Sequence, residues 1–201
     1  MKATILGLAI AATVLLAACS KEQPAGAPSE REATAAAPAG KATPAEPAAE
    51  GAAQIAPTQG NTVTGSVALS TSSEGVHITG TVQGLKPNAE FGFHVHEKGD
   101  CSAPDGSSAG GHFNPTSAEH GNPTSGTRHH AGDMLNIKSN GEGVAQVDTT
   151  AAGTTLHGNP PTDIMGKAIV VHEGPDDYTT QPSGNSGKRV ACGVIGAPSS
   201  P

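Results

Sequence analysis

Histidines in the second half of the chain have a spacing that suits metal binding. His94 and His96 are two residues apart in the run Gly-Phe-His-Val-His. Side chains two apart in a β-strand point to the same face, so both imidazoles can bind one ion. Further nitrogen and oxygen donors follow in a loop rich in Gly, Pro and Ser: His112, His120, His130 and Asp133. A bound metal ion would order such a loop, and these residue types therefore predict a metal centre.

The individual motifs have other interpretations when each is taken alone. A His-x-His pair also occurs in cupin-type metal barrels, and a histidine in a Gly-rich loop such as His112 is often only solvated. His172 ends the apolar run 168–171, where a buried histidine with an ordinary hydrogen-bond partner would also fit. His77 lies in a predicted strand and His157 in a loop, and we expect both to be ordinary residues.

The elements that must position these residues are β-strands. Alternating patterns at 62–69 and 76–82, separated by a short turn, predict a β-hairpin. Further strands are expected at 90–96, 133–138, 143–149, 167–172 and 190–195, with a tight turn at Asn140-Gly141 between two of them. Aromatic residues make up 2% of the chain and Trp is absent, so Val, Ile and Leu must form the core. The chain is predicted to be all-β.

The N-terminal part of the chain resembles an export signal followed by a tether. One early positive charge and a nearly all-apolar run predict a signal peptide at residues 1–19. Leu16-Ala17-Ala18-Cys19 is similar to a bacterial lipobox, in which Cys19 is lipidated. An ordinary cleaved signal is one alternative; an uncleaved transmembrane helix is another, although the apolar run is shorter than the roughly 20 residues that a bilayer needs. Residues 20–58, rich in Ala and Pro, are predicted to form a disordered tether, and residues 59–201 the folded domain.

Export and lipidation also account for the three cysteines. Lipid on Cys19 leaves Cys101 and Cys192 as a pair, and a disulfide persists in an exported protein. The expected location is the cell envelope, with the domain anchored to the membrane through Cys19 and facing the periplasm or the cell surface. The formal net charge is −7 and there is no basic patch, so nucleic-acid binding is not expected.

The motifs Gly92–Cys101, Gly110–Pro115, Ala118–Asp133 and Val170–Glu173, with Gly187–Gly196, closely resemble the copper/zinc superoxide dismutases over residues 60–197. The resemblance implies an eight-stranded Greek-key flattened barrel, or sandwich, with long metal-binding and electrostatic loops. It implies that copper is bound by His94, His96, His112 and His172, and zinc by His112, His120, His130 and Asp133. His112 would then bridge the two ions.

The resemblance also implies roles in the dismutation of superoxide to dioxygen and hydrogen peroxide. Arg189 would bind the incoming anion, and His112 would deliver a proton as peroxide forms. Asp176 would link His94 to His120, although Asp177 is adjacent and the sequence does not separate the two. The family pattern His-x-Gly-Asp selects His130 over His129 as the zinc ligand. A homodimer is compatible with the family, but the position of Cys101 looks bacterial and residues 176–196 look eukaryotic, so the interface is not defined.

Two other functions compete with dismutation. One is a non-catalytic copper-binding or copper-delivery lipoprotein on the same fold, and the other is a structural surface lipoprotein whose metal only orders loops. Copper-binding or copper-delivery proteins on this fold typically lose a copper ligand or the active-site arginine, and intact copper ligands also argue against a structural role. The sequence keeps all four copper positions and Arg189, which favours the enzyme.

Overall fold

The computed structural model describes residues 49–158 and 160–198. The predicted signal peptide, Cys19 and most of the predicted tether lie outside these residues. Within them, the chain forms antiparallel β-structure with one short 3-10 helix, Ser107–Ala109. None of the described helices is long and apolar enough to cross a membrane.

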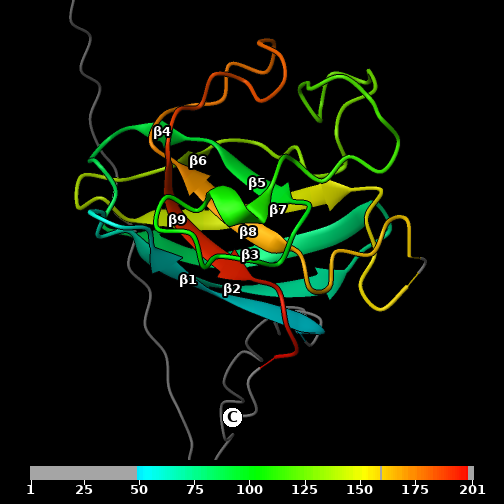
Figure 1. The fold of residues 1–201 in the computed structure, drawn as a ribbon, viewed down its shortest axis with the longest axis horizontal. Helices are drawn as coiled ribbons and strands as arrows, with labels where there is room; N and C mark the ends of the chain where they lie inside the picture. The colour runs from blue at the N-terminus through cyan, green and yellow to red at the C-terminus, as the bar shows by residue number, and fades with distance from the viewer. Residues whose placement is uncertain (1–48, 159, 199–201) are drawn as a thin grey trace, which may run out of the picture. The chain divides into compact units, whose positions relative to one another are not determined.

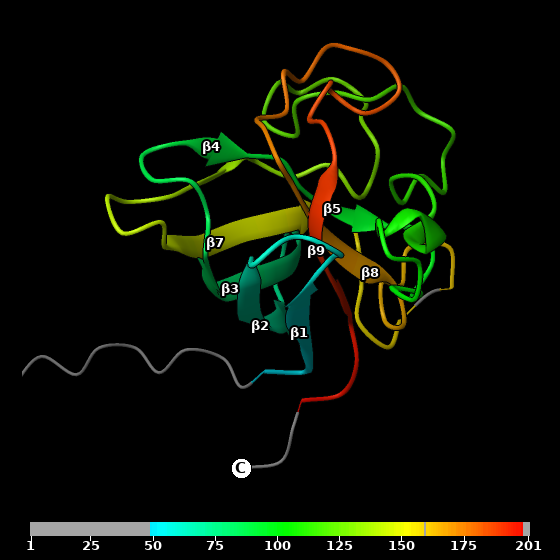
Figure 2. The same cartoon turned by 60° about the vertical axis from the view of Figure 1, so that its left-hand side comes forward.

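The strands close into a barrel, as Figures 1 and 2 show. The largest sheet has the order β5-β8-β9-β1-β2-β3-β7, and β4 pairs with β6. Only Gly92 separates β4 from β5, and a bridge between Ser139 and Ala145 joins the β6 end to β7. Counting β4 and β5 as one interrupted strand, the barrel has the eight strands that the resemblance implied. The bounds are β1 Gly51–Pro57, β2 Thr64–Thr71, β3 Gly75–Gln83, β4 Glu90–Phe91, β5 Phe93–His96, β6 Ile137–Lys138, β7 Ala145–Ala152, β8 Ala168–His172 and β9 Arg189–Val194.

The order of the strands is a Greek key. The interrupted strand β4/β5, β6 and β7 follow one another around the barrel, and the chain then returns to place β8 antiparallel to β5. This return brings His172, at the end of β8, next to the strand that carries His94 and His96. The connection therefore brings His172 close to His94 and His96, which are more than 70 residues away in sequence.

The predicted strands match the observed ones with local differences. β2 and β3 form the expected hairpin, with Thr71 opposite Val76 at its closed end. The side chain of Asn140 accepts the N–H groups of Glu142 and Val144, which fixes the expected turn. The strand expected at 133–138 is limited to Ile137–Lys138, because the preceding residues belong to the metal-binding loop.

The prediction of a disordered tether up to residue 58 is wrong at its C-terminal end. Residues Gly51–Pro57 form β1, which pairs with β2 on one side and β9 on the other. Ala53 and Ile55 point into the core and are 1% and 3% exposed. The sequence-based argument failed because it required large apolar residues, whereas a strand between two neighbours gains main-chain hydrogen bonds on both edges. The domain therefore begins no later than Gly51.

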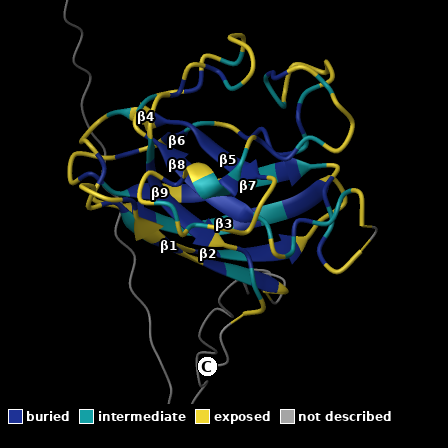
Figure 3. Ribbon diagram, viewed as in Figure 1, coloured by how far each residue is buried: buried dark blue, intermediate teal, exposed yellow. Residues whose placement is uncertain are grey.

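Aliphatic side chains and one disulfide hold the barrel together. The core contains buried Val, Ile and Leu from every long strand and all three Phe residues. In Figure 3 buried residues alternate with exposed ones along β1 and β2, and exposed residues are most frequent in the loops. The expected disulfide joins Cys101 to Cys192, whose Cα atoms are 5.8 Å apart. It ties the loop after β5 to β9. In both views the loops 115–131 and 173–187 rise from the same end of the barrel.

Candidate metal centre

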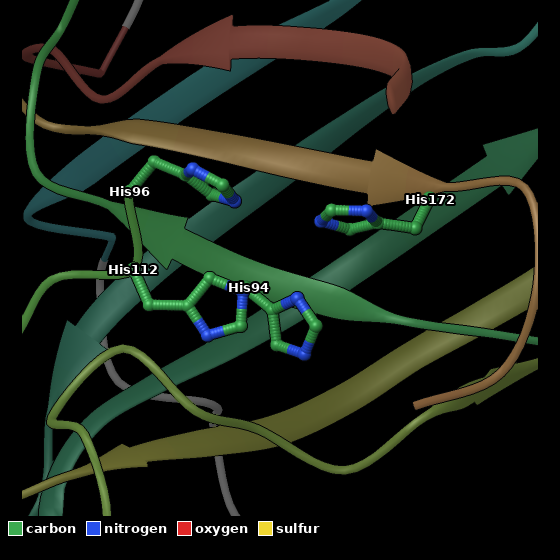
Figure 4. Close-up of side chains that lie close together, drawn as sticks. All are labelled: His94, His96, His112 and His172. Atoms are coloured by element: carbon green, nitrogen blue, oxygen red, sulfur yellow. The ribbon is translucent and has the colours of Figure 1, made fainter. Parts of the chain in front are cut away.

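Alternation along β5 separates core residues from metal donors. Phe93 and Val95 belong to the hydrophobic core, whereas His94 and His96 point to the opposite side. His172 at the end of β8 and His112 from the loop after β5 meet them there, and Figure 4 shows the four rings facing one another. All four are buried. The structure thus brings together the four residues to which the resemblance assigned copper.

The donor atoms of this first set converge without partners. His94 Nδ1 and the Nε2 atoms of His96, His112 and His172 are buried and lack a hydrogen-bond partner among the described residues. The set offers one donor atom from each ring, all within 4.8 Å of one another. Burying an unpaired ring nitrogen costs free energy. Four such nitrogens aimed at one point therefore fit a metal ion that prefers imidazole, and copper is such an ion.

The other ring nitrogens of the first set are fixed by acceptors. His96 Nδ1 donates to the Gly110 carbonyl at 2.9 Å, and His172 Nδ1 donates to the Gly187 carbonyl at 3.2 Å. His94 Nε2 donates to Asp176 Oδ2 at 2.7 Å. These bonds select the tautomer that turns a lone pair toward the centre. Burial lowers the pKa of His172 to about 3 and also lowers the pKa of His96 well below its usual value, so both rings are neutral and able to bind metal at pH 7.

A second set of donors surrounds Asp133. Asp133 Oδ1 lies 2.8, 3.0 and 3.2 Å from the Nδ1 atoms of His112, His120 and His130, respectively. The Nδ1 atoms of His112 and His130 are 3.5 Å apart. Donors bound at about 2.0–2.1 Å in a tetrahedral zinc site are separated by about 3.3 Å. The three nitrogens and one oxygen therefore fit zinc in both type and spacing.

His112 belongs to both sets. Its Nε2 faces the first set and its Nδ1 faces the second. Its ring centroid is 4.1 Å from that of His94 and 5.4 Å from that of His120. Burial lowers the pKa of His112 to about 4, although its hydrogen bond with Asp133 opposes the shift. One ring is thus placed to hold two ions.

The surroundings of Asp133 keep it ionised. Burial alone would raise the pKa of Asp133, but hydrogen bonds with the three histidines outweigh this effect and hold the pKa below its usual range. Asp133 Oδ2 also accepts the N–H groups of Gly121 and His130 at 3.1 and 3.0 Å. For His120 the directions are reversed. Burial would lower its pKa, but hydrogen bonds with Asp133 and Asp176 raise the pKa to about 9. Asp133 thus supplies a fixed negative charge, and a divalent cation bound there would displace the proton from His120.

The structure separates His130 from His129. His130 Nδ1 faces the second set, whereas His129 Nδ1 donates to the His130 carbonyl at 2.7 Å and its ring takes no place in either set. His77 and His157 lie outside both sets, as expected. His77 pairs with Asp148 at 2.8 Å, and His157 Nε2 lies 3.3 Å from the carbonyl of Glu50.

Asp176 connects the two donor sets. Its Oδ2 accepts His94 Nε2 at 2.7 Å and its Oδ1 accepts His120 Nε2 at 2.9 Å. Asp177 instead accepts hydrogen bonds from Thr179 and Thr180 within its own turn. A Cβ on Gly184, which has φ +68°, would collide with Asp176 and His120, so the residue there must be glycine. Asp176, and not Asp177, therefore holds a histidine of each set.

Asn136 is a supporting residue that the sequence did not reveal. Its Oδ1 accepts the Asp176 N–H and its Nδ2 donates to the Asp176 carbonyl, both at 2.9 Å. The two residues are 40 positions apart. No local pattern signals this contact, because it depends on how the loops meet.

Arg189 stands at the wall of a pocket that leads to the first set. The pocket has a volume of about 520 Å³, and its lining includes His96, His112, His172 and Arg189. Arg189 Nη1 donates to the Gly106 carbonyl at 2.7 Å, and Nη2 donates to the Gly110 carbonyl at 2.5 Å. The Gly110 carbonyl also accepts His96 Nδ1, so one peptide group positions both the guanidinium and a first-set histidine. Lys188 lines a neighbouring pocket with Asp105 and Glu173.

Comparisons with known proteins agree with this geometry. The family profile for copper/zinc superoxide dismutase (SODC) matches residues 63–195. Superoxide dismutase (Cu-Zn) 2 of Aquifex aeolicus strain VF5 is 43% identical over 148 residues, which covers 71% of this chain and 84% of that protein. Superoxide dismutase-like protein YojM of Bacillus subtilis strain 168 is 44% identical over 127 residues, or 61% of this chain and 63% of that protein. The crystal structure of a SOD-like protein from Bacillus subtilis is 40% identical, has a TM-score of 0.63, and covers 71% of this chain and 95% of that chain.

The profile spans most of the barrel and all of both donor sets. The Aquifex relative exceeds 40% identity over most of its length. Three further observations agree with this family: the order of motifs in the sequence, the Greek-key barrel and the two donor sets that share His112. The chain belongs to the copper/zinc superoxide dismutase family.

Proposed function

We propose that this protein dismutates superoxide to dioxygen and hydrogen peroxide, with copper in the first donor set and zinc in the second. The observation that carries the proposal is that both sets are complete and share His112, while Arg189 lines the pocket that reaches the first set. Bound copper would supply the one-electron redox chemistry, which zinc does not provide.

The residues of the chain supply positioning, charge and a proton. His94, His96 and His172 are held in metal-binding tautomers by Asp176 and two carbonyl groups. Asp133 fixes the Nδ1 side of the shared His112. His112 Nε2 faces the pocket side, where it can hold the proton that peroxide requires. Arg189 supplies a positive charge beside the first set for an anionic substrate.

A non-catalytic copper-binding or copper-delivery protein is the alternative. It is favoured by one specific observation, namely that a relative of 44% identity is named only superoxide dismutase-like. Membership of the family alone therefore does not establish that a protein turns over superoxide.

Metal content and turnover measured on one purified sample separate these functions. We expect one copper and one zinc per chain by elemental analysis, together with rapid superoxide loss by pulse radiolysis or stopped flow. Full copper loading with superoxide loss no faster than that caused by the metal-free chain would instead support the alternative.

We also propose that the protein is a lipoprotein of the cell envelope, anchored through Cys19 with the domain facing the periplasm or the cell surface. The lipobox-like tetrapeptide supports this location. The disulfide between Cys101 and Cys192 adds support, because disulfides persist outside the reducing cytosol. A homodimer remains a proposal based on the family resemblance.

Changing Cys19 to Ala should release the protein from the membrane fraction without altering the domain. The strands begin at Gly51, more than 30 residues after Cys19. Phase partition in detergent and mass spectrometry of the N-terminus test this, with unchanged superoxide turnover as the control. Membrane retention of the variant, or a Cys19 found in a disulfide, would contradict the anchor.

A further inference from the structure

A side chain from loop 173–187 holds the main chain of His120. Gln181 Oε1 accepts the His120 N–H at 2.9 Å, and Gln181 Nε2 donates to the His120 carbonyl at 2.8 Å. The two residues are 61 positions apart. One side-chain amide thus pairs with both main-chain groups of a single residue, as a neighbouring strand would. His120 itself is 4% exposed, whereas Gln181 is exposed.

The turn that carries Gln181 is built from hydrogen bonds of its own. Asp177 accepts the N–H groups of Thr179 and Thr180 at 2.9 and 2.7 Å. The Gly184 N–H donates to the Thr180 carbonyl at 2.7 Å, and the Asp177 N–H donates to the Gly184 carbonyl at 2.9 Å. None of these bonds uses a donor atom of either metal set. Gln181 is therefore presented to His120 by a turn whose shape does not require an ion.

The ring of His120 is held separately from its main chain. Its Nδ1 lies 3.0 Å from Asp133 Oδ1, and its Nε2 lies 2.9 Å from Asp176 Oδ1. An ion held by four donors leaves as successive donors detach. A donor whose main chain stays in place remains at high local concentration and can bind again before the next donor leaves. Fixing the His120 main chain should therefore slow the release of an ion.

We propose that Gln181 is a positioning residue that slows release of the ion from the second donor set by fixing His120. The inference rests on the proposed binding of zinc at that set. Residues next to metal ligands often change metal affinity by about 10- to 100-fold when they are lost. Gln181 acts on the main chain and from an exposed position, so we expect the lower end of this range.

Gln181→Met tests the proposal, because methionine has a similar length but neither hydrogen bond. Zinc transfer from the full-length, copper- and zinc-loaded protein to an excess of a chromogenic chelator is followed by absorbance. We expect release about 10-fold faster than from the wild type. Gln181→Glu keeps an acceptor for the His120 N–H but loses the donor, so its rate should fall between the two. Thermal unfolding of the metal-free forms should differ by only a few degrees, the scale expected for the loss of two partly exposed hydrogen bonds.

Gln146→Met is the matched control. Gln146 is an exposed residue of β7 that accepts a 3.3 Å hydrogen bond from Thr81, and its variant should release zinc at the wild-type rate. Equal release from Gln181→Met and wild type would overturn the inference alone. Faster release would also overturn it if metal-free Gln181→Met unfolded far below the metal-free wild type, well beyond those few degrees, because the role of Gln181 would then be a general structural one. A wild-type protein that retained no zinc would overturn the proposed function as well.

Discussion

Replacing His96 with alanine is expected to reduce superoxide turnover by roughly 10³-fold or more, the scale of effect seen when an essential catalytic group is removed. His96 Nε2 is one of four buried nitrogens that converge on the first set, and the three that remain would leave incomplete the tetragonal geometry that Cu(II) favours. The domain should still fold, because β5 keeps its main-chain pairing with β8 and its core residues Phe93 and Val95. Elemental analysis should show copper lost and zinc largely kept, and circular dichroism should match the metal-free wild type.

Asp133→Ala provides the comparison. Asp133 Oδ1 approaches three ring nitrogens of the second set, so its loss should lower zinc content and thermal stability first. Full zinc occupancy in Asp133→Ala would show that the second set is not the zinc site. His130→Ala and His129→Ala extend the comparison, and only the former should reduce zinc content. A His96→Ala variant with wild-type turnover would refute copper binding by the first set.

Replacing Arg189 with glutamate should lower the rate of reaction with superoxide by one or more orders of magnitude at low salt. The chain has a formal net charge of −7, so an anion approaching it depends on local positive charge. Burial lowers the pKa of Arg189 only from its very high usual value, and the guanidinium remains charged beside His96. Electrostatic steering changes association rates by about 10- to 10³-fold. A carboxylate at this position would reverse the local charge.

Salt dependence separates steering from damage to the site. The Debye length shrinks to about 10 Å at 0.1 M, so added salt should partly restore the rate of Arg189→Glu while it slows the wild type. Arg189→Lys keeps the charge but loses the two-point contact with the Gly106 and Gly110 carbonyls that places it, so its rate should fall between those of the wild type and Arg189→Glu.

Arg128→Glu makes the same charge change on the exposed surface of the 115–131 loop and is the matched control. It should react at close to the wild-type rate. Copper content must be equal in all these variants. An Arg189→Glu protein as fast as wild type at every ionic strength would assign Arg189 a surface role and favour the copper-binding alternative.

The two metal sets, the supporting contacts and the pocket form one connected unit. Asp176 joins His94 to His120, and the Gly110 carbonyl joins His96 to Arg189. A change at Asp176 can therefore affect both donor sets, and a change at Gly110 can affect both His96 and Arg189. For this reason each prediction measures copper and zinc separately from turnover.

The sequence by itself determined the donors and the kind of fold. His94 and His96 were predictable because alternation in a strand is local. His130 with Asp133 was selected by the family pattern His-x-Gly-Asp. Short local patterns also predicted the hairpin at 62–82 and the turn at Asn140. A count of cysteines, with Cys19 assigned to the lipid, predicted the pairing of Cys101 with Cys192.

Only the tertiary structure decided which residues support the donors and where the domain begins. β1 has few large side chains, and its stability comes from two neighbouring strands, one of them near the other end of the chain. Asp176 is distinguished from Asp177 by the direction of its carboxylate, and Asn136 and Gln181 act across 40 and 61 residues of sequence. Main-chain hydrogen bonds and contacts between loops depend on closure of the barrel, and a pattern of neighbouring residues does not contain that information.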